Sequence, residues 1–226
     1  MTLKIKKRSF LTHHNHPNSV IANEYEYIRQ NIEFSTYENS CRSLLVTSPG
    51  KGEGKSTTSA NLAVVLATPD KKVLLIDANI KKPSIHHLFK IKNTIGLTNI
   101  LSGQKTLGDT VNQTDIVSLK VLTSGPLPYN IESLLKSKNM ESLYEQALKL
   151  YDYIVFDTPS VLEDNTAKIL SAKCDGVILV IKSGKTEDNL ALEAKRSLQM
   201  SKAKILGVIF NNKKRKFSLK RTSKQP

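Results

Sequence analysis

A glycine-rich loop that contains a lysine is the feature of this sequence that points most directly to chemistry. It reads Ser48-Pro49-Gly50-Lys51-Gly52-Glu53-Gly54-Lys55-Ser56-Thr57. Glycines allow positive φ and a close backbone approach, so that successive N–H groups can point at a phosphate chain. Lys55 can neutralise the β and γ phosphates, and the Ser56 hydroxyl can ligate Mg²⁺. We therefore expect the nucleotide phosphates to contact Gly50, Gly52, Glu53, Gly54, Lys55, Ser56 and Thr57.

The loop departs from the strict template G-x-x-x-x-G-K-[ST] at its first position, where Pro49 stands. An apolar segment precedes the loop and an apolar helical pattern, residues 59–67, follows it directly. The N-terminus of that helix would add a partial positive charge beside the phosphates. A flexible turn with a chance lysine is the alternative, and the flanking strand and helix argue against it.

Two aspartates end apolar segments elsewhere in the chain, Asp77 after residues 73–76 and Asp157 after residues 153–156. Ligands of an open parallel sheet bind at the carboxyl ends of its strands, so both aspartates would lie at one edge with Lys55. Carboxylates and a hydroxyl suit Mg²⁺ that bridges nucleotide phosphates. The sequence therefore predicts catalytic roles for Lys55, Asp77 and Asp157, and a metal site of Ser56, Asp77 and Asp157. Each aspartate taken alone could instead cap the turn that follows it.

The nucleotide is expected to be ATP, because the sequence contains no Asn-Lys-x-Asp segment of the guanine-binding type. Asn211 follows the last apolar segment and is a candidate for reading the adenine edge. An ordinary turn asparagine is the competing interpretation of this residue.

Short apolar runs alternate with helical patterns along the chain. Strands are predicted at residues 43–47, 73–77, 119–123, 153–157, 177–182 and 204–210, and helices at 20–35, 56–67, 139–150, 164–172 and 187–200. Several of these strands are apolar almost throughout, as in sheets that are covered on both faces. The alternation predicts an α/β fold in which helices flank both faces of a parallel sheet.

The net charge of +14 in 226 residues is concentrated at the two ends of the chain. Residues 1–19 hold four basic side chains and residues 213–226 hold seven, with no acid in either segment, which leaves a net charge of about +3 on residues 20–212. We therefore expect a basic N-terminal segment (1–19), one ATP-binding domain (20–212) and a basic, disordered tail (213–226). The basic ends could bind an anionic membrane surface or a nucleic acid, or could merely keep the protein soluble.

No segment reaches the roughly 18 consecutive apolar residues that a membrane span needs, and the N-terminus lacks the apolar stretch of a secretory signal. Any membrane contact is therefore expected to be peripheral. The two cysteines, Cys41 and Cys174, have neither disulfide-framework nor metal-site spacing, which fits a cytosolic compartment.

Three segments, residues 47–57, 74–83 and 153–159, resemble the Walker-type motifs of the bacterial tyrosine kinases that are encoded with capsule genes. Gly96-Leu97, Leu101-Ser102-Gly103, Ser124-Gly125-Pro126 and Gly207-Val208-Ile209 also resemble that family, so the resemblance extends over residues 20–212. It implies a P-loop NTPase of the deviant-Walker type that uses ATP and Mg²⁺ to phosphorylate protein tyrosines. In this family Lys55 would bind phosphates, Ser56 would bind Mg²⁺, and Asp77 and Asp157 would belong to the second and third motifs.

The resemblance also implies a partner and a place in the cell. The partner is a membrane-embedded regulator of polysaccharide chain length, which acts as the activator. The kinase would be cytoplasmic, held at the inner face of the cell membrane through that partner, and would regulate polysaccharide assembly or export.

Three departures from the family pattern stand out. The second motif of the family reads Asp-x-Asp, whereas its second acid is here Asn79. An amide cannot act as a general base and is a poorer Mg²⁺ ligand than a carboxylate, so slower phosphoryl transfer is expected. The helical Glu-x-x-Arg-x-x-Arg motif that joins family members into a ring is replaced by Asn23, Glu26 and Arg29, so a ring is not expected.

The third departure is that the family's C-terminal tyrosine cluster is missing, since the last tyrosine is Tyr153. Two alternatives to an active kinase therefore stay open. One is a weakly active or inactive ATP-binding regulatory subunit of the same system. The other is a partition-like ATPase that holds DNA with its basic tail, which the near-neutral body disfavours, as it disfavours nucleic acid as a partner in general.

Overall fold

The sheet at the centre of this protein has seven strands in the order β3-β4-β2-β5-β1-β6-β7. The computed structural model describes residues 11, 18–35 and 41–212, so the two predicted basic ends lie largely outside the described residues. Six strands are parallel, as predicted: β1 (Ser43–Thr47), β2 (Val73–Asp77), β4 (Leu119–Leu122), β5 (Tyr153–Asp157), β6 (Gly176–Lys182) and β7 (Ile205–Asn211).

One strand differs from the predicted all-parallel sheet. The two-residue β3 (Asn112–Gln113) pairs antiparallel with β4 at the edge of the sheet. Only a short loop joins these two strands, and a short connection allows antiparallel pairing, whereas a parallel pair needs a long crossover.

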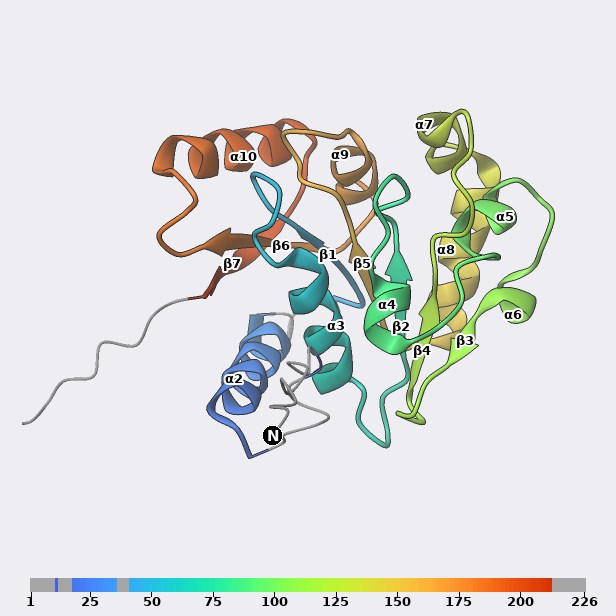
Figure 1. Ribbon diagram of the computed structural model, residues 1–226, viewed down its shortest axis with the longest axis horizontal. Helices are drawn as coiled ribbons and strands as arrows, with labels where there is room; N and C mark the ends of the chain where they lie inside the picture. The colour runs from blue at the N-terminus through green and yellow to red at the C-terminus, as the bar shows by residue number, and fades with distance from the viewer. Residues whose placement is uncertain (1–10, 12–17, 36–40, 213–226) are drawn as a thin grey trace, which may run out of the picture.

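Helices cover both faces of the sheet (Figure 1). The helices α2 (Val20–Ser35), α3 (Lys55–Leu66), α8 (Lys138–Leu150), α9 (Thr166–Ser171) and α10 (Asp188–Met200) begin and end within two residues of their predicted bounds. Four further helices were not predicted: α4 (Ile85–Phe89), α5 (Leu97–Leu101), α6 (Leu107–Thr110) and α7 (Ile131–Leu135). Each has only four or five residues, too few to display a helical repeat of apolar positions.

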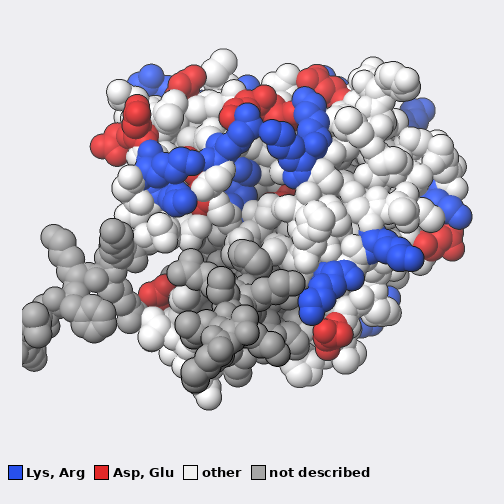
Figure 2. All heavy atoms as spheres, viewed as in Figure 1, with Lys and Arg blue, Asp and Glu red and all other residues white. Residues whose placement is uncertain are grey.

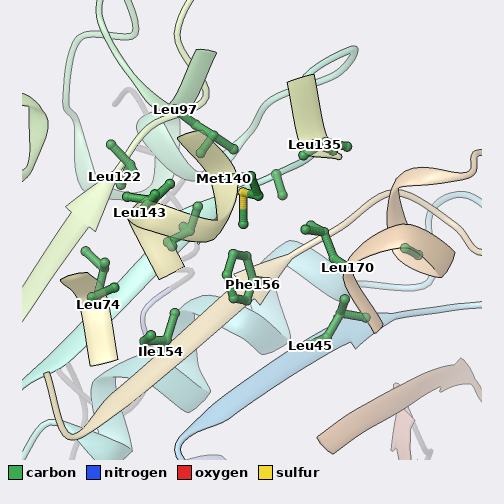
Figure 3. Close-up of a cluster of buried hydrophobic side chains, with 14 of the residues drawn as sticks. Leu45, Leu74, Leu97, Leu122, Leu135, Met140, Leu143, Ile154, Phe156 and Leu170 are labelled. Carbon is green, nitrogen blue, oxygen red and sulfur yellow. The ribbon is translucent and has the colours of Figure 1, made fainter. Parts of the chain in front are cut away.

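The buried side chains form two clusters, one on each face of the sheet. Consecutive strand residues alternate between them, so that Leu45 belongs to one cluster while Leu44 and Val46 belong to the other. The first cluster includes side chains of α5 to α10, and the second includes side chains of α2, α3 and α4. Figure 3 shows the first cluster, where Phe156 of β5 points toward Met140 of α8.

This two-sided burial explains why the strands are apolar throughout. Every side chain of β1 and β2 is buried, including the terminal Asp77. Within the described residues, every helix is too short or too polar to cross a bilayer. The two-sided cover leaves the carboxyl ends of the strands as the edge where loops can build a site.

Candidate active site

The glycine-rich loop connects β1 to α3, which is the order that the sequence predicted. Gly52 and Gly54 have φ angles of 73° and 97°, a region that favours glycine, whereas the φ angle of Gly50 is not positive. Gly54 is the residue before the first turn of α3, and a Cβ atom there would lie 2.0 Å from the Nδ2 atom of Asn211. Gly52 and Gly54 therefore use the positive φ that glycine allows, whereas Gly50 does not.

Lys55 lies inside this loop and is 8% exposed. Its Nζ atom donates to the Oγ atoms of Ser48 (3.0 Å) and Ser160 (3.1 Å) and to the carbonyl oxygen of Gly50 (3.4 Å). Burial lowers the pKa of Lys55, and the negative charge of Asp157 opposes that effect. Neutral oxygens hold the ammonium group, so no ion pair must break before it binds phosphate.

Ser56 and Asp157 meet beneath the loop. The Ser56 hydroxyl donates to the Oδ2 atom of Asp157 at 2.6 Å, and the Ser59 hydroxyl donates to Oδ1 at 2.9 Å. Burial raises the pKa of Asp157, and the two serine hydrogen bonds and Lys55 oppose that rise. Ser56 faces the cavity described below, whereas the Asp157 carboxylate is completely buried behind it.

Asp77 is adjacent to Asp157 in the sheet register, but its carboxylate accepts hydrogen bonds from backbone N–H groups instead of serine hydroxyls. Its Oδ1 atom accepts a hydrogen bond from the backbone N–H of Asn79 (3.1 Å), and Oδ2 accepts from the N–H groups of Ser84 and Ile85 (both 3.0 Å). Burial and the charge of Asp157 raise the pKa of Asp77. The carboxylate thus fixes the loop between β2 and α4, which is the capping role that the sequence left as an alternative.

A cavity of about 460 Å³ opens at this edge of the sheet. The phosphate loop, the loop after β2 and the loop after β5 line it with Lys51, Gly52, Gly54, Lys55, Ser56, Thr57, Asn79, Lys81, Lys82, Pro159, Ser160, Glu163 and Asp164. Five of the predicted site residues do not line it: Gly50, Glu53, Asp77, Asp157 and Asn211. The Asn211 amide donates to the carbonyl oxygen of Glu53 at 2.8 Å, so it braces the loop from the end of β7.

Ion pairs connect the loops at the mouth of the cavity. Lys51 Nζ lies 2.9 Å from Glu163 Oε1, and Lys81 Nζ lies 2.7 Å from Asp164 Oδ2. Figure 2 shows basic side chains, interspersed with acidic ones, gathered on the face over the phosphate loop. Ion pairs between exposed groups, such as Lys51 with Glu163, are weak, about 0–1 kcal/mol, so an incoming polyphosphate can compete for Lys51.

Sequence reasoning missed two groups of residues at this site. Two serines hold Lys55, and they are Ser48 and Ser160. Neither has a motif of its own, although Ser160 follows the strand that ends in Asp157. The lysines at the mouth, Lys81 and Lys82, stand inside the second resembling segment, which could have indicated them.

Comparison with known proteins reveals clear similarity. Residues 40–224 match the ParA family model, described as NUBPL iron-transfer P-loop NTPase. The tyrosine-protein kinase YwqD of Bacillus subtilis (strain 168) is 47% identical over 198 residues, 88% of this chain and 84% of the relative. The putative tyrosine-protein kinase CapB of Staphylococcus aureus is 36% identical over 88% of this chain and 87% of the relative. The crystal structure of the chimerical protein CapA2B2 superposes with a TM-score of 0.88 and 34% identity, covering 92% of each chain.

Proposed function

Because this chain belongs to the bacterial protein-tyrosine kinases of the capsule type, with the P-loop NTPase fold of the ParA family, we propose that it transfers the γ-phosphoryl group of ATP to protein tyrosines in capsule or exopolysaccharide production. One observation carries the assignment of the site. Lys55, Ser56 and Asp157 converge beneath a glycine-rich loop at one end of a cavity of about 460 Å³. Phosphoryl transfer needs chiefly positioning and charge neutralisation, and these groups can supply both.

Mg²⁺ fits the chemistry of this donor set, since hard divalent cations prefer hydroxyl and carboxylate oxygens. Ser56 would hold the ion from the cavity side, and Asp157 would orient Ser56 from behind through the 2.6 Å hydrogen bond. When bound there, the ion would supply positive charge that offsets the negative charge developing on the phosphates. Lys55 would exchange its contacts with Ser48 and Ser160 for the β and γ phosphates.

Asp77 would act as a positioning residue in this scheme. By holding the backbone of Asn79, Ser84 and Ile85, it orients the loop that carries Asn79 to the cavity. The amide of Asn79 stands where a second carboxylate would accept the tyrosine proton or bind the metal. We therefore expect transfer to be slow.

Asn79 also favours a second candidate function, an ATP-bound regulatory subunit of the same polysaccharide system with little kinase activity. The same cavity would bind ATP in both cases, so binding alone does not separate them. A partition-like ATPase is the weaker alternative, because the ParA family match describes the shared fold while the relatives above are named tyrosine kinases.

The proposed partner is a membrane-embedded regulator of polysaccharide chain length that activates the kinase from the inner face of the cell membrane. Family membership supports this proposal, and one similar solved structure is that of the chimerical protein CapA2B2. The basic ends of the chain, residues 1–19 and 213–226, could add attraction to anionic lipid.

Transfer of radiolabelled phosphate to a copolymer of glutamate and tyrosine tests the proposal. The whole chain is incubated with Mg·ATP, with and without the cytoplasmic tail of the candidate membrane activator. Label on the copolymer, stimulated by the tail, is the expected result. Tight ATP binding without any label would instead favour the regulatory subunit, and failure to bind ATP would contradict both functions.

A further inference from the structure

Tyr129 is the most exposed tyrosine among the described residues. Its relative exposure is 112%, against 65% for Tyr27. The other described tyrosines are buried or intermediate in exposure. Tyr129 lies in the segment that joins β4 to α7, beyond the carboxyl end of β4 (Figure 1). The strands that end in Asp77 and Asp157 deliver their side chains to this same edge of the parallel sheet.

The segment around Tyr129 is anchored on both sides. The backbone N–H of Gly125 donates to Asn93 Oδ1 at 2.9 Å, and the Thr98 hydroxyl donates to the carbonyl oxygen of Pro126 at 2.9 Å. On the other side, the Asn130 side chain caps α7 by accepting from the N–H of Ser133 at 3.1 Å. Pro126 and Pro128 restrict the backbone between these anchors. The phenol therefore projects from an ordered, non-helical segment, so little entropy is lost when another protein binds it.

This segment leads directly to the rim of the nucleotide cavity. Glu132, three residues after Tyr129, accepts a 2.9 Å hydrogen bond from Asn165. A groove of about 180 Å³ is lined by Glu132 together with Lys81, Glu163 and Asp164, and the last three also line the nucleotide cavity. The pKa of Lys81 is raised first by Asp164 and more weakly by Glu132, which indicates that Glu132 is close to this lysine.

We propose that Tyr129 is an autophosphorylation site, at which one copy of this chain phosphorylates another. The inference rests on the proposed kinase function. Tyr129 does not line the cavity of its own chain and projects into solvent from an anchored segment, so the phosphate must come from a second copy. The phenolic oxygen forms a bond to the γ-phosphorus as the bond to the β-phosphate oxygen breaks. ADP leaves with that electron pair, and the phenolic proton passes to solvent.

Tyr27 offers a matched comparison. Among the described tyrosines it is the other largely exposed one, but it lies in the middle of α2, where the backbone is committed to helical hydrogen bonds. An acceptor tyrosine must enter the cavity of another molecule, and a helical backbone around it would have to unwind first. Tyr37 lies outside the described residues and is included in the test as a separate variant.

The test uses the whole chain with Mg·ATP and locates phosphate by mass spectrometry in the wild type and in Tyr129→Phe, Tyr27→Phe and Tyr37→Phe. Tyr129→Phe should lose at least about 90% of autophosphorylation, while the other two variants keep it. In a mixture of active Tyr129→Phe with inactive Lys55→Met, phosphate should appear on Tyr129 of the Lys55→Met copy. Phosphate on Tyr27 or Tyr37 instead would overturn the inference.

A second acceptor separates this inference from the proposed function. All variants are also assayed with the copolymer of glutamate and tyrosine, which Tyr129→Phe should label at the wild-type rate. Labelled copolymer with unlabelled Tyr129 would refute the autophosphorylation site and leave the kinase function intact. If neither acceptor is labelled, the kinase function fails and the inference fails with it.

Discussion

The Ser56 hydroxyl donates a 2.6 Å hydrogen bond to the carboxylate of Asp157, a residue 101 positions further along the chain. The pair joins the first turn of α3 to the carboxyl end of β5, directly below the phosphate loop. Because Ser56 faces the cavity and Asp157 is buried, we propose that Ser56 would bind the metal ion and that Asp157 would support Ser56 from behind.

Ser56→Ala should raise the Mg²⁺ concentration needed for half-maximal phosphoryl transfer by about 10–100-fold, since the hydroxyl is a proposed metal ligand. Ser59→Ala is the matched control, because it removes a 2.9 Å hydrogen bond to the same carboxylate from a residue that does not line the cavity. This control should change the Mg²⁺ requirement by less than about threefold. Equal effects of the two variants would mean that Ser56 acts only by orienting Asp157.

Lys55→Met should weaken ATP binding at least about 100-fold, because it removes the ammonium group of the one lysine that is buried within the phosphate loop. Methionine has a similar length, so the fold should persist. Calorimetric titration with Mg·ATP measures the affinity, and circular dichroism monitors folding. Lys72→Met, which removes an exposed lysine beside β2, should bind ATP like the wild type. Unchanged affinity in Lys55→Met would remove the proposed phosphate site.

Asn79→Asp should speed phosphoryl transfer about tenfold or more, because it restores a carboxylate that can accept a proton at the cavity wall. Asn189→Asp adds the same charge on an exposed position of α10 and should leave the rate unchanged. Initial rates with the glutamate and tyrosine copolymer provide the measurement. If Asn79→Asp is no faster than the wild type, the amide is not the cause of slow transfer.

Gly54→Ala should lower the free energy of unfolding by about 2 kcal/mol or more. The new methyl group is strained at a φ of 97° and also displaces the Asn211 amide, which costs its hydrogen bond to Glu53. Gly184→Ala separates the two effects, since Gly184 has a φ of 72° but nothing within 4 Å of the added Cβ. It should cost only about 1 kcal/mol in urea denaturation. Equal losses would mean that the contact with Asn211 contributes nothing.

Asp77 should make stability depend on pH. Burial and the nearby Asp157 raise its pKa from 3.8 to about 7, so between these values the folded state holds a proton that the unfolded state has released. This contribution to stability is fully present below about pH 4 and is lost as the pH rises through 7.

Asp77→Asn cannot titrate and isolates this effect. The free energy of unfolding of the wild type, measured in urea without nucleotide, should fall relative to that of Asp77→Asn between pH 4 and pH 7. Parallel pH profiles for the two proteins would show that Asp77 does not carry the expected shift.

Local sequence patterns determined the framework of this protein. Continuous apolar runs such as residues 73–76 produce strands that are buried on both faces, and the period of about 3.6 residues in α8 marks a helix with one buried side. The strand, glycine-rich loop and helix around Lys55 follow one another in the chain, so the phosphate loop could also be predicted. Each of these signals depends on neighbouring residues.

The tertiary structure decided what the individual site residues do. Asp77 and Asp157 have the same sequence context, yet one accepts backbone N–H groups of its own loop and the other accepts serine hydroxyls of α3. Ser160 holds Lys55 across 105 positions, and the segment that carries Tyr129 is anchored by the distant side chains of Asn93 and Thr98. Such partners are set by strand order, register and loop packing, which no local spacing encodes, because a hydrogen bond depends on where two atoms lie in space.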